Sequence, residues 1–223
     1  MDATAYKDSG FIQTVGQVVP IKVNAEKEGV ALAKKYDVHG YPTILFLDEN
    51  GSVAYKIGGY LPTPAFKSEI GIAYDAYHNL ASYENRLLVA PNDIGTVERV
   101  ALIYIKKDKL DKALPLLVRA ETADPQGKLG PLDVVYDGFG NYYQSKGNIV
   151  QSNIAFEKAL KISNDDFIRA DSTLSLAQNY FTTDKDKAQK YLLDLQAQPN
   201  APADWKKIGD SMLKQLNKTK GSG

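Results

Sequence analysis

Residues 40–51 read GYPTILFLDENG, and they determine how the first part of the chain folds. The run Thr43–Leu47 is apolar and rich in β-branched and aromatic residues, which is typical of a buried strand. Asn50-Gly51 follows it, and this pair is a strong signal for a hairpin turn. Ser52–Ile57 is then the return strand, and Gly58-Gly59 ends it. We therefore predict an antiparallel hairpin over Thr43–Ile57.

The residues before the hairpin indicate one more strand and one helix. Val18–Val23 is short, apolar and β-branched, and Pro20 within it fits an edge or the start of a strand. Asn24 is a helix-capping residue type, so we predict a helix over Glu26–Tyr36. Its apolar face consists of Val30, Leu32, Ala33 and Tyr36. Gly40 and Pro42 then interrupt the helical pattern.

Beyond Pro64 the periodicity is helical throughout. Proline suits the first turn of a helix, so Pro62 and Pro64 predict a long helix that begins near Ala65. Turn-forming residues separate the later helices, near residues 90–92, 107–108, 124–131, 146–148, 163–165, 183–184 and 199–202. We predict α/β plus all-α as the fold class, with domains over residues 1–75 and 76–220. A helix joins the two domains, which predicts that they pack rigidly.

The helical part also contains an internal repeat. Around Tyr136 the order of large, small and aromatic residues matches a tetratricopeptide repeat, in which small residues let two helices approach closely. An earlier unit begins at Val97, and a looser third unit begins at Thr173. The repeat-packing positions that we single out are Ala101, Tyr104, Gly140, Tyr143, Phe156 and Ala159. The alternative is a general helical bundle with coincidental spacing.

The last helix has the pattern of a cap for an open repeat stack. We predict it over Ala203–Leu216, with lysines on its polar side. Its apolar face contains Trp205, Ile208, Met212, Leu213 and Leu216.

The order of elements around Gly40-Tyr41-Pro42-Thr43 resembles the second half of a thioredoxin fold, and the resemblance covers residues 1–75. It implies that the Tyr41–Pro42 peptide bond is cis. It also implies a peptide-binding position at Gly40, Tyr41 and Pro42, because in that family the backbone beside the cis-proline pairs with substrate peptide. The alternative is that Tyr41 is a turn residue packed on a helix.

The first residues resemble the helix that follows the Cys-x-x-Cys motif in secreted thioredoxin-like proteins, through Met1-Asp2, Tyr6 and Phe11-Ile12. The resemblance implies that the central strand and the cysteine motif are missing, so we expect a fragment of a longer protein. The central strand would lie between Val18–Val23 and Thr43–Leu47. Buried unpaired backbone groups cost about 1–3 kcal/mol each. Either the two strands therefore pair with each other, or another chain supplies the missing strand.

Composition argues against several kinds of site. The chain has no cysteine, which removes thiolate nucleophiles and disulfides, and we expect no catalytic residue. His39 and His78 are the two histidines, and we expect neither of them to bind a metal. A formal net charge of zero disfavours nucleic acid as a partner. No apolar run approaches the ~20 residues of a membrane helix. We therefore expect no metal, cofactor, nucleic-acid or membrane partner.

Two functional hypotheses follow from the sequence. The first is a redox-inactive interaction module that binds protein or peptide clients, since a thioredoxin-like domain before tetratricopeptide repeats is similar to the chaperedoxin arrangement. The second is a fragment of a thiol–disulfide oxidoreductase. No phosphate-binding loop, dinucleotide fingerprint or nucleophile elbow supports another enzyme class. The first residues lack a signal-peptide pattern, so either the chain is cytosolic or its targeting signal lies upstream; by the resemblance, the longer protein would be periplasmic.

Overall fold

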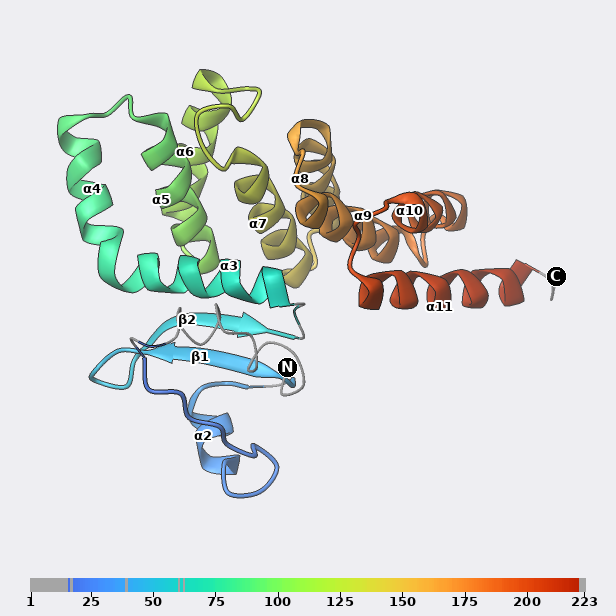
Figure 1. Ribbon diagram of the computed structural model, residues 1–223, viewed down its shortest axis with the longest axis horizontal. Helices are drawn as coiled ribbons and strands as arrows, with labels where there is room; N and C mark the ends of the chain where they lie inside the picture. The colour runs from blue at the N-terminus through green and yellow to red at the C-terminus, as the bar shows by residue number, and fades with distance from the viewer. Residues whose placement is uncertain (1–15, 17, 39, 60, 62, 221–223) are drawn as a thin grey trace. The chain divides into compact units, whose positions relative to one another are not determined.

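The computed structural model describes residues 16, 18–38, 40–59, 61 and 63–220. The chain divides into two compact units, Met1–Ser82 and Tyr83–Gly223, with the boundary inside helix α4 (Leu80–Val89). The first unit contains a small antiparallel sheet with helices, and the second is a stack of helices (Figure 1). This arrangement confirms the predicted fold class.

The first unit has at its centre the hairpin predicted from residues 40–51. Strand β1 (Thr43–Leu47) pairs antiparallel with β2 (Val53–Gly58), with Ile44 opposite Ile57 and Phe46 opposite Tyr55. The prediction of a hairpin is therefore confirmed. A register irregularity between Phe46 and Leu47 precedes the turn.

The turn of the hairpin is held by the side chain of Asp48. Its Oδ1 atom accepts hydrogen bonds from the backbone N–H of Asn50 (2.9 Å) and of Ser52 (2.8 Å). Gly51 has a φ of 75°, a conformation that glycine adopts without the steric cost that a Cβ would add. The Asn-Gly signal thus acts together with an aspartate at the first position of the turn, a residue type that commonly caps turns.

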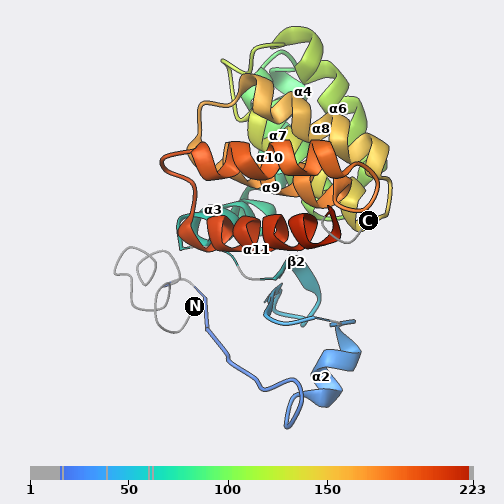
Figure 2. The ribbon, with the colours of Figure 1, turned by 90° about the vertical axis from the view of Figure 1, so that its right-hand side faces the viewer.

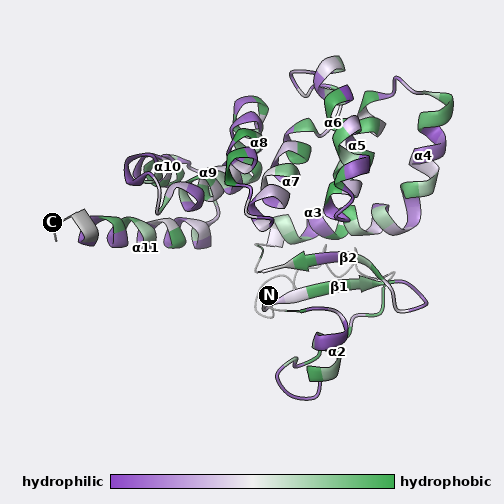
Figure 3. Ribbon diagram, turned by 180° about the vertical axis from the view of Figure 1, so that it is seen from behind, coloured by the Kyte–Doolittle hydropathy of each residue, from purple (hydrophilic) through white to green (hydrophobic). Residues whose placement is uncertain are grey.

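One face of the hairpin packs on the helix that follows it. Helix α3 (Thr63–Tyr74) continues into a π-helical turn, η3 (Asp75–Asn79). Buried side chains of β2, Tyr55 and Ile57, belong to the same core as Phe66 and Ile70 of α3. In Figure 3, β1 runs from pale to hydrophobic colours, whereas β2 combines hydrophobic and hydrophilic colours. The Tyr55 hydroxyl donates a 2.6 Å hydrogen bond to Glu69, and burial raises the pKa of Tyr55 well above its usual value.

The prediction of a strand over Val18–Val23 is wrong. These residues form no strand, and Val19 and Ile21 are 86% and 81% exposed. A strand needs hydrogen bonds to a neighbouring strand. In the described part of the chain the sheet has only β1 and β2, so residues 18–23 have no strand partner. Of the two alternatives considered for the gap, pairing of Val18–Val23 with β1 does not occur.

The helix predicted over Glu26–Tyr36 is shorter than expected. Residues 25–29 form turns, and α2 spans only Val30–Lys35. Asn24 accepts a hydrogen bond from the Glu26 backbone N–H (3.0 Å) ahead of the helix. Helix α2 contains no buried residue, so the expected apolar face is not packed. Most helical stability comes from packing an apolar face, which explains why this helix remains short. The N-terminal helix expected from Met1-Asp2 and Phe11-Ile12, and His39, lie outside the described residues.

The second unit consists of successive antiparallel helices, and every predicted break between them is confirmed. After α4, the bounds are α5 Ile94–Lys106, α6 Leu110–Ala123, α7 Leu132–Ser145, α8 Ile149–Ile162, α9 Asp166–Tyr180, α10 Lys185–Ala197 and α11 Ala203–Lys220. Helices pack in consecutive pairs, α5 with α6, α7 with α8 and α9 with α10. The first helices of the pairs also contact one another in sequence, α5 with α7 and α7 with α9.

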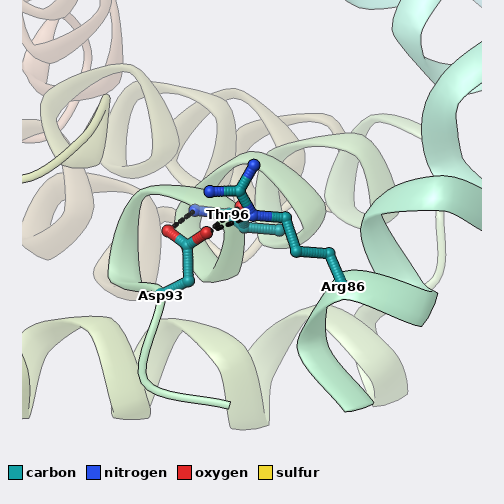
Figure 4. A network of polar contacts seen from close by, with 3 residues as sticks. All are labelled: Arg86, Asp93 and Thr96. Carbon is teal, nitrogen blue, oxygen red and sulfur yellow. Dashed lines mark hydrogen bonds and ion pairs between the residues drawn. The ribbon is translucent and has the colours of Figure 1, made fainter. Parts of the chain in front are cut away.

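The start of the stack is fixed by a capping network. Asp93 is the N-cap of α5, and its carboxylate accepts hydrogen bonds from the Thr96 backbone N–H (3.3 Å) and hydroxyl (2.9 Å). Arg86 at the end of α4 forms an ion pair with the same carboxylate (Figure 4). The Thr96 hydroxyl and Arg86 lower the pKa of Asp93, because both stabilise its charged form. An aspartate cap of this kind accepts hydrogen bonds from N–H groups of the first turn, which have no partner within the helix.

The end of the stack is covered by α11, which lies beside α10 (Figure 2). Trp205 and Leu216 are buried against the stack, and the Trp205 ring lies 4.6 Å from that of Phe167 in α9. The prediction that Ile208 belongs to the apolar face is wrong, since Ile208 is 43% exposed. The helix also runs four residues further than predicted, to Lys220.

Candidate peptide-binding site

The turn from Gly40 to Thr43 is the part of the first unit that the sequence singled out for binding. Its Tyr41–Pro42 peptide bond is cis, which confirms the prediction. The Thr43 hydroxyl donates a 2.7 Å hydrogen bond to the Gly40 carbonyl, and the Gly59 N–H donates a 2.9 Å hydrogen bond to the Pro42 carbonyl. The first of these hydrogen bonds closes the turn on itself, and the second joins the turn to the residue after β2.

Tyr41 is exposed to solvent. Its residue is 56% exposed, and among the described residues neither its backbone N–H nor its carbonyl has a hydrogen-bond partner. Gly40 beside it has open space around the position of a Cβ. Strand β1 begins two residues later and has β2 on one side, with no described strand on the other. Tyr41 therefore presents, at one place, an aromatic ring and backbone groups that are unpaired among the described residues.

The chain before the turn is attached to the hairpin by two side chains. Lys56 of β2 donates a 2.9 Å hydrogen bond to the Asp37 carbonyl, and the Tyr36 hydroxyl donates one of 3.1 Å to the Gly51 carbonyl. Asp37 adopts a φ of 51°, which is uncommon outside glycine and reverses the chain direction after α2. These contacts position the turn without using Tyr41.

The π-helical turn η3 contains His78, the histidine that lies among the described residues. The His78 ring lies 4.3 Å from that of Tyr74 and 4.6 Å from that of Tyr77. The Tyr77 hydroxyl donates to Glu49 and lowers the pKa of that carboxyl, which links η3 to the hairpin turn. Aromatic packing and the Tyr77–Glu49 hydrogen bond hold these side chains in place.

In the second unit, five of the six repeat-packing positions are buried, and Tyr143 is the exception. Ala101, Phe156 and Ala159 are fully buried, and Gly140 lies directly against the Phe156 ring. Tyr104 is buried, and its hydroxyl donates to Glu84 of α4. Tyr143 is half-buried, with its ring 6.2 Å from that of Phe139.

Sequence reasoning missed a polar network between the first helices of two neighbouring pairs. The Asp137 carboxylate of α7 accepts hydrogen bonds from Ser172 of α9 (2.9 Å) and from Asn141 (2.9 Å). Burial raises the pKa of Asp137 well above its usual value, and the nearby Asp171 raises it further. The signal available was an acidic residue in the middle of an apolar helix, Asp137 between Tyr136 and Gly138. Its bonds to α9 make it a packing group rather than a ligand-binding one.

Two kinds of feature are absent from the described residues: a metal-binding cluster and a membrane-spanning helix. In the ranges that the structure covers, no three His, Asp or Glu side chains are grouped so that they could hold a metal ion. Across the same residues, no helix has both the length and the apolar character that crossing a bilayer requires.

Comparison with known proteins gives one match. Neither the curated proteins nor the solved structures contain a match to this chain. The family model of a thioredoxin-like domain matches residues 3–71. That range ends inside α3 and contains α2, the cis-proline turn and the hairpin. Residues 3–71 accordingly match a thioredoxin-like domain.

Proposed function

We propose that this chain is a redox-inactive interaction module that binds extended segments of unfolded polypeptide at the Tyr41 turn. The observation that carries the proposal is the exposed Tyr41, whose backbone N–H and carbonyl are unpaired among the described residues. Extended peptides bind by adding main-chain hydrogen bonds to an open backbone edge, while side-chain contacts supply selectivity. Tyrosine contributes a large ring with few rotatable bonds, which lowers the entropy cost of binding.

The composition of the chain supports binding rather than thiol exchange. Disulfide exchange requires a thiolate, and the chain has no cysteine. The cis-proline turn is nonetheless kept in place by Thr43 and Gly59. A turn that is maintained without its redox partner is suited to recognising peptide backbone.

The helical unit adds a second surface to the proposal. We interpret it as a tetratricopeptide-like stack, supported by consecutive helix pairs with Ala101, Gly140 and Ala159 at close contacts. Repeat stacks of this kind display extended surfaces for binding peptides. In the proposal, the stack engages protein partners while the Tyr41 turn holds an extended segment.

Fluorescence anisotropy tests the proposal with a probe that cannot refold. The probe is labelled α-lactalbumin, reduced and carboxymethylated so that it stays unfolded, and the comparison is the native disulfide-bonded form. We expect the full chain to bind the unfolded form with a dissociation constant in the micromolar range, about −8 kcal/mol. Added reductant should have no effect, because no thiol takes part.

Two tyrosine variants locate the binding position. Tyr41→Ala should weaken binding by about tenfold, since removing an aromatic contact costs roughly 1–2 kcal/mol. Tyr74→Ala, which removes a partly exposed ring on α3, should bind as the wild type does. Equal affinity for native and unfolded probe, or equal affinity of wild type and Tyr41→Ala, would show that the Tyr41 turn is not the binding site.

A further inference from the structure

Glu98 is a carboxyl group buried without a partner. It lies on α5 between Val97 and Val100, is 0% exposed, and both of its carboxylate oxygens lack a hydrogen-bond partner among the described residues. Asp137, the buried acid of α7, accepts hydrogen bonds from Ser172 and Asn141. A buried carboxylate without hydrogen bonds is costly to ionise, so such a group requires a physical account.

The backbone of the segment that follows α6 lies directly against the Glu98 carboxylate. Residues 124–131, here called the 124–131 connection, join α6 to α7. A Cβ at Gly130 would meet the Glu98 carboxylate and lie 2.8 Å from the Gly95 Cα, and a Cβ at Gly95 would lie 2.8 Å from the Leu129 carbonyl oxygen. The backbone of the connection therefore rests directly on the first turns of α5, over Glu98.

The titratable groups that face Glu98 come from the end of α6 and from α7. Asp124, at the end of α6, is buried and accepts a 2.6 Å hydrogen bond from the Leu129 N–H within the connection. Asp133 and Tyr136 lie on α7. Burial raises the pKa of Glu98 to about 7, with smaller contributions in the same direction from Asp124 and Asp133. Among the described residues, no ion pair with a cation offsets this repulsion.

We propose that Glu98 is a proton-controlled latch for the 124–131 connection. A protonated Glu98 is neutral and stays buried beneath the connection. An ionised Glu98 carries its charge next to Asp124 and Asp133 without a hydrogen bond, and it regains water only when the connection lifts from α5. Because the connection joins the α5–α6 pair to the α7–α8 pair, its release loosens the junction between these pairs.

Two measurements on the wild-type full chain test the latch directly. Carbon-detected NMR follows the Glu98 carboxyl carbon with pH, and hydrogen exchange follows the amides of Lys128, Leu129 and Gly130. We expect a titration midpoint well above the ordinary value near 4.5, together with an increase of about tenfold in the opening of these amides from about pH 5 to pH 7.5, after correction for intrinsic exchange. A Glu98 midpoint of about 4–5, or opening that is independent of pH, overturns the proposal.

A neutral variant assigns the effect to Glu98. Glu98→Gln keeps the shape of the side chain and cannot titrate, so opening of the connection should become independent of pH. Glu157→Gln, which changes an exposed glutamate on α8, should keep the wild-type pH dependence. If Glu98→Gln retains that dependence, the latch is wrong. If Glu98→Gln does not fold, the wild-type titration of the Glu98 carboxyl carbon decides the question alone.

Discussion

Gly140 of α7 lies directly against the ring of Phe156 in α8. A Cβ at position 140 would lie 2.6 Å from Cδ1 and 2.8 Å from Cζ of Phe156, and Phe156 itself is fully buried. Glycine inside a helix costs about 0.5–1 kcal/mol relative to alanine. The close approach of the two helices offsets this cost, because it lets the Phe156 ring fill the space that a side chain would occupy.

The first prediction concerns this contact. Gly140→Ala should lower the free energy of unfolding by about 1–3 kcal/mol through overpacking, although alanine is the better helix former. Urea unfolding followed by far-UV circular dichroism measures it. Gly71→Ala is the matched helical control, since a Cβ there meets nothing within 4 Å. We expect that variant to be neutral or slightly stabilising, and a stabilising Gly140→Ala would contradict the packing described.

The second prediction concerns the small residues of two other contacts. Ala101 and Ala159 are both fully buried, so Ala101→Leu and Ala159→Leu should each lower stability by about 1–3 kcal/mol. Lys107→Ala, in the turn after α5, should stay within about 0.5 kcal/mol of the wild type. Thermal melts of the three variants provide the comparison. If all three melt as the wild type does, the helices are not packed through these positions.

The helical unit could be predicted from sequence more fully than the first unit. Helix breaks depend on local residues, such as Lys146-Gly147-Asn148 between α7 and α8, and all of them were found. The hairpin was predictable for the same reason, since Asn50-Gly51 specifies its own turn. Val18–Val23 was not, because an apolar β-branched run becomes a strand only beside a partner, and the described sheet offers none.

Part of the candidate site was also accessible from sequence. The resemblance gave the cis bond at Tyr41–Pro42, whereas the exposure of Tyr41 required the structure. Glu98 and Asp137 were missed because helical periodicity does not report how a neighbouring connection or helix covers a position. The backbone of Gly130, more than thirty residues further along the chain, lies directly against the Glu98 carboxylate.

The third prediction is a decrease in stability with rising pH. The pKa of Glu98 is raised from 4.5 to about 7 in the folded chain, so the folded state binds this proton more tightly than the unfolded state. Its contribution is fully present below about pH 4.5 and is lost as the pH rises to about 7. The buried Asp137, whose pKa is also raised, acts in the same direction.

We therefore expect the helical unit to be about 1–2 kcal/mol more stable at about pH 5 than at about pH 7.5. Urea denaturation at the two pH values measures the difference, and Glu98→Gln should reduce it. Asp93 and Asp108 have lowered pKa values, so they titrate below this range and do not reverse the trend. Greater stability at the higher pH would be inconsistent with a neutral buried Glu98.

The fourth prediction concerns thiol chemistry. The purified chain should show no insulin-reduction and no dithiol-oxidation activity above buffer, because it has no cysteine. A turbidity assay with insulin and a fluorescent dithiol substrate measure the two activities. Turnover that persists after removal of contaminating thiols would contradict this prediction.

The central claim is that local packing in the helical unit stabilises this chain, while the thioredoxin-like unit is held more weakly. Hydrogen exchange by mass spectrometry on the full chain tests it most directly. Amides of Val18–Val23 and Thr43–Leu47 should exchange faster than those of Tyr136–Ala159, because the former lie in an unpaired segment and a two-stranded sheet, and the latter surround buried Phe139 and Phe156. If Thr43–Leu47 contains the best-protected amides of the chain, the claim is wrong.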